Sequence, residues 1–117
     1  MNYVQLLEEV KEEVIRFYEL NIDDGYSYHD IDHTTDVVEH AAEIARHYNL
    51  GDREFFIVCT AAWFHDVGYY MGGSTEHEKR GTEMAEAFLL AKAVDPTVIA
   101  EVKQAIMATC LPQTPTH

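Results

Sequence analysis

Histidines are frequent in this chain, and one of them stands beside an aspartate in a strongly apolar context. Seven of the 117 residues are histidine, and His65 is followed directly by Asp66 at the end of the run AAWF. An unpaired carboxylate in or beside a core is costly, so something must compensate for Asp66. A divalent cation would do so, since imidazole nitrogen and carboxylate oxygen are ligands of Zn, Mn, Fe and Mg. A neighbouring His or Arg that pairs with the carboxylate is the competing interpretation.

The other histidines differ in where a helical projection places them. His33 borders the apolar side of the helix it begins, at the end where a loop arrives, whereas His40 and His47 drift toward solvent. We therefore expect His40 and His47 at the surface. His29 falls in the preceding loop, and His77 lies at the start of a later helix.

The elements that must position these groups are helices, because the apolar spacing follows a helical period almost throughout and no segment alternates as a strand would. Five helices are expected: Asn2 to about Leu20, about His33 to Asn49, Asp52 toward Gly68, Thr75 to near Ala93, and Asp95 to about Thr109. A loop is expected over Asn21–Asp32. The third helix is apolar on most faces and should be central in the bundle.

Caps and apolar faces are expected as follows. Gly51 should end the second helix and Asp52 should cap the third, while Thr75–Glu78 reads as a capping box and Asp95 with Pro96 as a cap and first-turn proline. The buried face of the first helix should comprise Val4, Leu7, Val10, Val14, Phe17 and Tyr18. That of the second should comprise Val37, Val38, Ala41, Ile44, Ala45 and Tyr48.

The composition argues against several classes of function. Twenty-one acidic and eight basic residues give a net charge of −13, which disfavours nucleic-acid polymers and anionic membranes. The longest apolar run, Phe55 to Phe64, is too short to span a bilayer, and the amino terminus carries no signal peptide. Cys59 and Cys110 lie in apolar stretches without a CxxC, as expected of buried thiols. We expect a single cytoplasmic domain over residues 1–117.

Four segments, taken in order, carry a family resemblance. They are YHDIDHTTDVV (Tyr28–Val38), AAWFHDVGY (Ala61–Tyr69), EHEKRGTEMAEAFL (Glu76–Leu89) and IMATCLPQTPTH (Ile106–His117). Together they resemble the HD-domain superfamily of metal-dependent phosphohydrolases, from about residue 26 to the end of the chain. The resemblance implies an all-α, HD-domain-like bundle of about five helices.

The resemblance also implies a site. His33, His65 and Asp66 would ligate one divalent ion, which would be Mn, Fe, Zn, Ni or Mg. His29 would line the site and contact substrate. Asp66 would both ligate and orient the attacking water.

Two further sets of residues follow from the same resemblance. His77 matches a position that binds a second metal or contacts phosphate in some relatives, and a plain helix-cap role stays open for it. Lys79 and Arg80 form an adjacent cationic pair that would neutralise a phosphate, with an ordinary helix-surface role as the alternative. His77 and Lys79 would stabilise charge that develops on the phosphate.

The sequence departs from the family pattern at one point. The family's metal set is completed by an aspartate on a later helix, and this sequence reaches His117 before any such residue. We expect a C-terminally truncated bundle, the N-terminal part of a longer protein, in which the metal is weakly held or absent and the activity is lost. The alternative is that water or another group completes the metal site.

The function implied is metal-dependent hydrolysis of a small phosphate ester or anhydride, with a nucleotide the expected substrate and a homodimer a further expectation. The first alternative is a non-catalytic metal- or nucleotide-binding regulatory domain of a larger signalling protein. The second is a helical interaction module in which the His–Asp pair is satisfied within the core and no metal binds.

Overall fold

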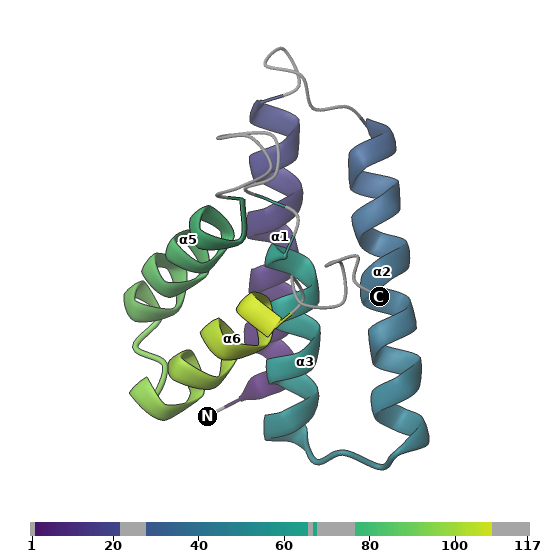
Figure 1. The fold of residues 1–117 in the computed structure, drawn as a ribbon, viewed down its shortest axis with the longest axis vertical. Helices are drawn as coiled ribbons and strands as arrows, with labels where there is room; N and C mark the ends of the chain where they lie inside the picture. Colours follow the sequence, from purple (N-terminus) through teal and green to yellow (C-terminus); the bar gives the residue numbers. More distant parts are fainter. Residues whose placement is uncertain (1, 22–27, 66, 68–76, 109–117) are drawn as a thin grey trace, which may run out of the picture.

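The structure is a computed structural model that describes residues 2–21, 28–65, 67 and 77–108. Throughout these ranges the regular structure is helical, as expected from the apolar spacing. The helices are α1 (Tyr3–Leu20), α2 (Tyr28–His47), α3 (Asp52–Phe64), α5 (His77–Ala91) and α6 (Pro96–Ala108) (Figure 1). The expectation of an all-α bundle of about five helices is confirmed.

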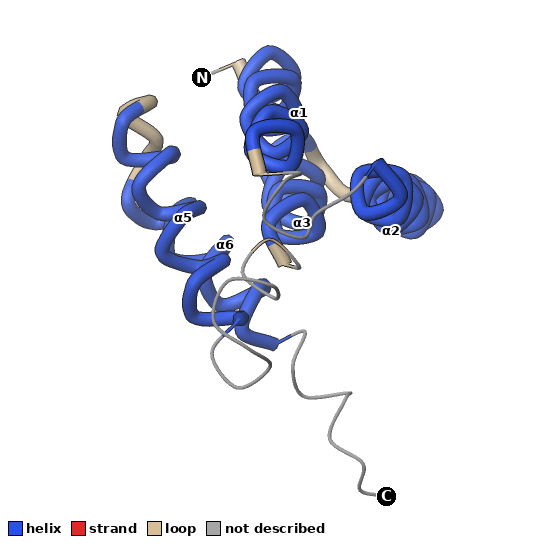
Figure 2. Tube along the Cα trace, turned by 90° about the horizontal axis from the view of Figure 1, so that it is seen from above, coloured by secondary structure: helices blue, strands red, loops and turns tan. Residues whose placement is uncertain are grey.

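Helix α3 is the centre of the bundle. It packs against α1, α2, α5 and α6, whereas α1 and α2 touch each other much less and α5 packs mainly on α6. In the view from above in Figure 2, α1 and α3 lie next to each other in the middle, α2 lies on one side of them, and α5 and α6 lie on the other side. An apolar helix with neighbours on most of its faces is the placement that its sequence indicates.

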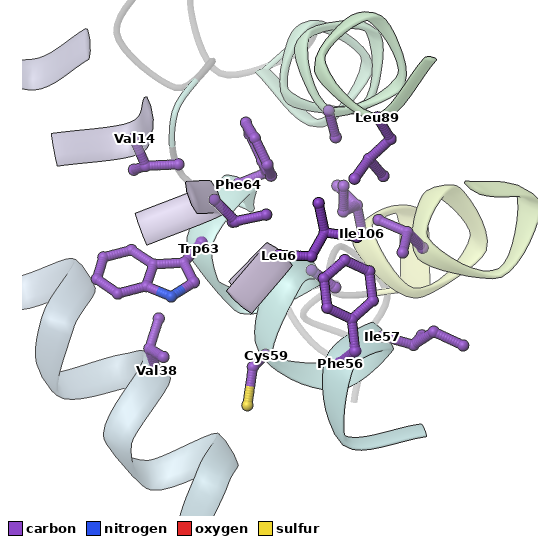
Figure 3. Close-up of a cluster of buried hydrophobic side chains, with 14 of the residues drawn as sticks. Leu6, Val14, Val38, Phe56, Ile57, Cys59, Trp63, Phe64, Leu89 and Ile106 are labelled. Carbon is purple, nitrogen blue, oxygen red and sulfur yellow. The ribbon is translucent and has the colours of Figure 1, made fainter. Parts of the chain in front are cut away.

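The core fills the space around α3. Phe56 and Phe64 are fully buried and meet Leu6 of α1, Leu89 of α5 and Ile106 of α6 (Figure 3). On the side toward α2, Trp63 and Cys59 pack with Val38. Burial raises the pKa of the Cys59 thiol to about 11, so the group stays neutral at physiological pH. The buried thiol expected at Cys59 is confirmed, and Cys110 lies outside the described residues.

Helix α2 begins earlier than the sequence suggested. The predicted loop over Asn21–Asp32 is wrong in its second part, because the helix starts at Tyr28. His29 therefore lies in the first helical turn and His33 more than a turn inside the helix. Asp30 lies in that first turn, where a carboxylate interacts favourably with the partial positive charge of the helix terminus.

Helix α2 also ends differently. Asn49, with a φ of 56°, takes the left-handed conformation, and the amides of Asn49 and Leu50 bond back to the carbonyls of Arg46 and Ala45. Asparagine tolerates this conformation. Gly51, the predicted stop, is instead the N-cap of α3 in an extended conformation, and Asp52, the predicted cap, is the first residue of that helix.

Two predicted apolar faces need correction. On α1 the buried line runs through Leu6, Val10, Val14 and Tyr18, while Val4 is 71% exposed. On α2, Val38, Ala42 and Ala45 are buried, but Ile44 and Tyr48 are 58% and 69% exposed. The other described helices pack against one side of α2, and the apolar face of α2 is wider than this area of contact. Part of the apolar face therefore stays exposed.

The start of α6 agrees with the sequence. The Asp95 carboxylate accepts hydrogen bonds from the Thr97 amide at 2.8 Å and the Thr97 hydroxyl at 2.7 Å. These bonds hold the pKa of Asp95 below its usual value. The predicted cap is confirmed. Within the described residues, no helix combines the length and the apolar character needed to cross a membrane.

Candidate functional site

His65 follows the last residue of α3 and is half-buried. Its Nδ1 lies 2.9 Å from the carbonyl oxygen of Ala62. A carbonyl oxygen can only accept, so Nδ1 carries the proton and Nε2 is the nitrogen with the lone pair. This is how metal-binding histidines are usually oriented, with one ring nitrogen held by a backbone carbonyl and the other directed at the ion.

His33 lies on α2 with an exposed side chain. It shares one face of the helix with Val37 and Ala41, since residues four apart lie above one another. The next residue, Thr34, is buried, and its Oγ1 lies 3.1 Å from the hydroxyl oxygen of Tyr18 on α1. This hydrogen bond joins α1 to α2 at the level of His33.

The two histidines extend toward the same end of one helix pair. Helices α2 and α3 are antiparallel neighbours (Figure 1). Val37 of α2 and Ala62 of α3 line one pocket between them. His33 lies about 6 Å before Val37 along α2, and His65 lies about 4.5 Å after Ala62 along α3, which in an antiparallel pair is the same direction.

That pocket is an apolar cavity of about 350 Å³. Its described lining comes from α2, α3 and α6 and comprises Val37, Ala41, Val58, Ala61, Ala62, His65 and Ala105. His65 therefore stands between the pocket and the end of the bundle where His33 lies.

Of the other predicted site residues, the structure describes the side chains of Lys79 and Arg80. Asp66, the third predicted ligand, lies outside the described residues. His29 and His77 belong to the first turns of α2 and α5, and nothing is described of their side chains. Lys79 and Arg80 are exposed in the first turn of α5, and neither has an ion-pair partner among the described residues. His40 and His47 are exposed, as predicted.

The described residues include two of the three predicted metal ligands, His33 and His65. His33 and His65 each carry an imidazole, a common metal ligand, and the hydrogen bond from His65 Nδ1 to the Ala62 carbonyl favours the tautomer that would coordinate through Nε2. No group of three potential ligands occurs within the described ranges. Asp66 is adjacent in sequence to His65 and would be the third.

The small residues that line the pocket were not predicted as site residues. Ala41 was predicted on the buried face of its helix, and Ala61 and Ala62 belong to a long apolar run. The available signal was the four-residue spacing His33–Val37–Ala41, which continues one face from the histidine down the helix.

Fold and site together define an all-helical bundle with two histidines toward one end of an antiparallel helix pair. A family model, the HD domain, matches residues 30–112, and the chain belongs to this family. HD domains are typically metal-dependent hydrolases that bind divalent ions. Neither a search of curated proteins nor one of solved structures found a match.

Proposed function

We propose that this chain is a metal-dependent phosphohydrolase that acts on a small phosphate ester or anhydride. The observation that supports the proposal is the position of His33 and His65 toward the same end of the antiparallel α2–α3 pair, with Nδ1 of His65 bonded to the Ala62 carbonyl. Metal-dependent hydrolysis is typical of the HD family to which the chain belongs.

His33, His65 and Asp66 are the proposed metal ligands. When bound, the ion supplies Lewis-acid polarisation of a phosphoryl oxygen and lowers the pKa of water. The Ala62 carbonyl keeps the proton of His65 on Nδ1. Asp66 would orient water for attack.

The cationic residues of α5 have a different proposed role. Lys79 and Arg80 are exposed, and a guanidinium or ammonium group free of ion pairs can bind a phosphate oxygen by charge-assisted hydrogen bonds. His77 and Lys79 would then stabilise charge on the phosphate, while Arg80 and His29 would hold the substrate. Nucleotides are the first substrates to test, since the chain's acidity favours small metal-chelated anions over polymers.

The test is the metal content of the purified chain, measured by elemental mass spectrometry. We expect about one Mn, Fe, Zn or Ni per chain, lost in the His33→Ala, His65→Ala double variant. His40→Ala is the matched control, because His40 lies on the same helix as His33 and is exposed. A hydrolysis screen with Mn, Fe, Zn, Ni and Mg should then show phosphate release from at least one nucleotide or other phosphate ester.

Each other outcome points to an alternative. Metal binding without release of phosphate from any ester would indicate a regulatory domain. A chain that refuses every added metal, and whose stability falls more in the double variant than in His40→Ala, would indicate a helical interaction module in which the histidines serve the fold.

A further inference from the structure

The pocket beside His65 is unusual for a phosphate-binding site because its described wall is almost wholly hydrocarbon. Six of the lining side chains are alanine or valine, and His65 is the one polar group among those described. No lysine, arginine, asparagine, glutamine, serine or threonine is among these described lining residues. The wall therefore offers apolar contact rather than hydrogen bonds.

This lining constrains what lies next to the phosphate. Selective binding of a polar group such as a nucleobase requires placed donors and acceptors, and a polar group buried without them is destabilised. A second phosphate would meet no cation in this wall. An alkyl or aryl group would instead gain from leaving water, roughly in proportion to the area that it buries.

We infer that the organic group of the substrate is apolar, so that the substrates are phosphate monoesters of alkyl or aryl alcohols rather than the nucleotides that the chain's acidity alone would put first. The phosphate lies at the end of the pocket marked by His65, on the side toward His33, and the hydrocarbon lies between α2, α3 and α6. The inference rests on the proposed function, since it takes the phosphate to be bound at those histidines.

Val37 and Ala41 line the pocket on the α2 side, and Ala41 is the smaller of the two. Its side chain is half-buried, lies one turn from Val37 and lines the cavity. Replacement by leucine would add three carbon atoms to this wall and remove space that a substrate's hydrocarbon would occupy. Ala42, the next residue, lines a separate groove formed by α1, α2 and α3, and it does not line the pocket beside His65.

The test uses n-alkylphosphonates from methyl to hexyl, whose P–C bond is not hydrolysed, with the full chain loaded with Mn²⁺. Calorimetry should show the Kd falling by about three- to fourfold for each added methylene until the pocket is filled. Hydrolysis of the matching n-alkyl phosphates should show the same trend in kcat/KM. Their leaving alcohols are of nearly equal acidity, so the trend reports binding rather than reactivity.

Two variants test whether the dependence of affinity on alkyl chain length arises in this pocket. Ala41→Leu should flatten the dependence on chain length, and Ala42→Leu, the matched control, should retain it. A series with equal affinity for methyl- and hexylphosphonate on Mn²⁺-loaded chain would overturn the inference and leave the proposed function intact. The same flattening in Ala42→Leu would also overturn it. A chain that takes up no Mn²⁺ would contradict the proposed function, and the inference with it.

Discussion

Two threonines show how the chemistry of single atoms shapes this bundle. Thr34 and Thr60 are both buried, at 1% and 0% exposure. Thr34 Oγ1 shares a hydrogen bond with the Tyr18 hydroxyl at 3.1 Å. Thr60 Oγ1, by contrast, has no hydrogen-bond partner in the part of the chain that the structure describes. The same side chain therefore stabilises the fold at one position and destabilises it at the other.

Replacement of each threonine by valine should change stability in opposite directions. Thr34→Val removes a buried hydrogen bond that joins α1 to α2, and should lower the free energy of unfolding by about 1 kcal/mol. Thr60→Val removes an unsatisfied hydroxyl and should raise it by about 1 kcal/mol. Urea unfolding followed by far-UV circular dichroism measures both.

The two variants control each other, since both put a methyl group in place of a hydroxyl in a buried helix. Destabilisation by Thr60→Val would show that its hydroxyl has a partner. Metal affinity supplies a second readout, because Thr34 is adjacent to His33. We expect Thr34→Val to weaken metal binding more than Thr60→Val does.

At the scale of elements, local signals could be predicted from the sequence and non-local ones could not. The Asp95 cap and the start of α6 followed from neighbouring residues, because such a cap is a bond within one turn. The exposure of Ile44 and Tyr48 did not follow, because it depends on which helices pack against α2. Hydrophobic periodicity gives the orientation of an apolar arc but not how much of it is covered.

Some features of the candidate site could likewise be predicted from the sequence, and others could not. The prediction of His33 and His65 as ligands rests on motif order, whereas the exposure of His40 and His47 was predicted from helical projection and is confirmed. The pocket could not be identified, because Val58 and Ala105 come from different helices and meet Ala41 only in the packed bundle. The hydrogen bond from His65 to the Ala62 carbonyl depends on the conformation in which α3 ends.

One ion pair joins the central helix to α6 and gives a prediction at this scale. The Arg53 guanidinium donates to both carboxylate oxygens of Glu101, at 3.1 and 2.7 Å. This contact holds the pKa of Glu101 below its usual value of 4.5 and that of Arg53 above its own. Glu101→Gln should lower the Tm by a few degrees at neutral pH, measured by calorimetry.

The pH dependence has a definite sign. A carboxyl whose pKa is lowered by folding stabilises the fold above its unfolded pKa, and that contribution is lost as pH falls through the lowered value. The Tm difference between the parent chain and Glu101→Gln should therefore be complete above about pH 5 and shrink below pH 4.5. Lys103→Met, which breaks the single contact of Lys103 to Glu86 at 3.0 Å, should have the smaller effect. A larger one would show that bidentate geometry is not what matters.

The whole molecule is dominated by negative charge. Ion pairs within the described ranges engage Arg53, Lys92 and Lys103 with carboxylates of other helices. The net charge of −13 nevertheless leaves most of the 21 acidic residues without a compensating cation. Like charges at this density repel one another more in the compact state than in the expanded one.

Salt should therefore stabilise this protein. From about 10 mM to about 1 M NaCl the Debye length falls from about 30 Å to about 3 Å, which screens the repulsion between exposed carboxylates. The Tm, measured by calorimetry with EDTA present to exclude divalent ions, should rise over this range. A triple variant, Glu12→Gln with Glu19→Gln and Glu83→Gln, removes three exposed carboxylates. It should have a higher Tm at low salt and a weaker response to NaCl. A Tm that falls with NaCl would instead mean that the ion pairs of Arg53, Lys92 and Lys103 outweigh the repulsion among the remaining carboxylates.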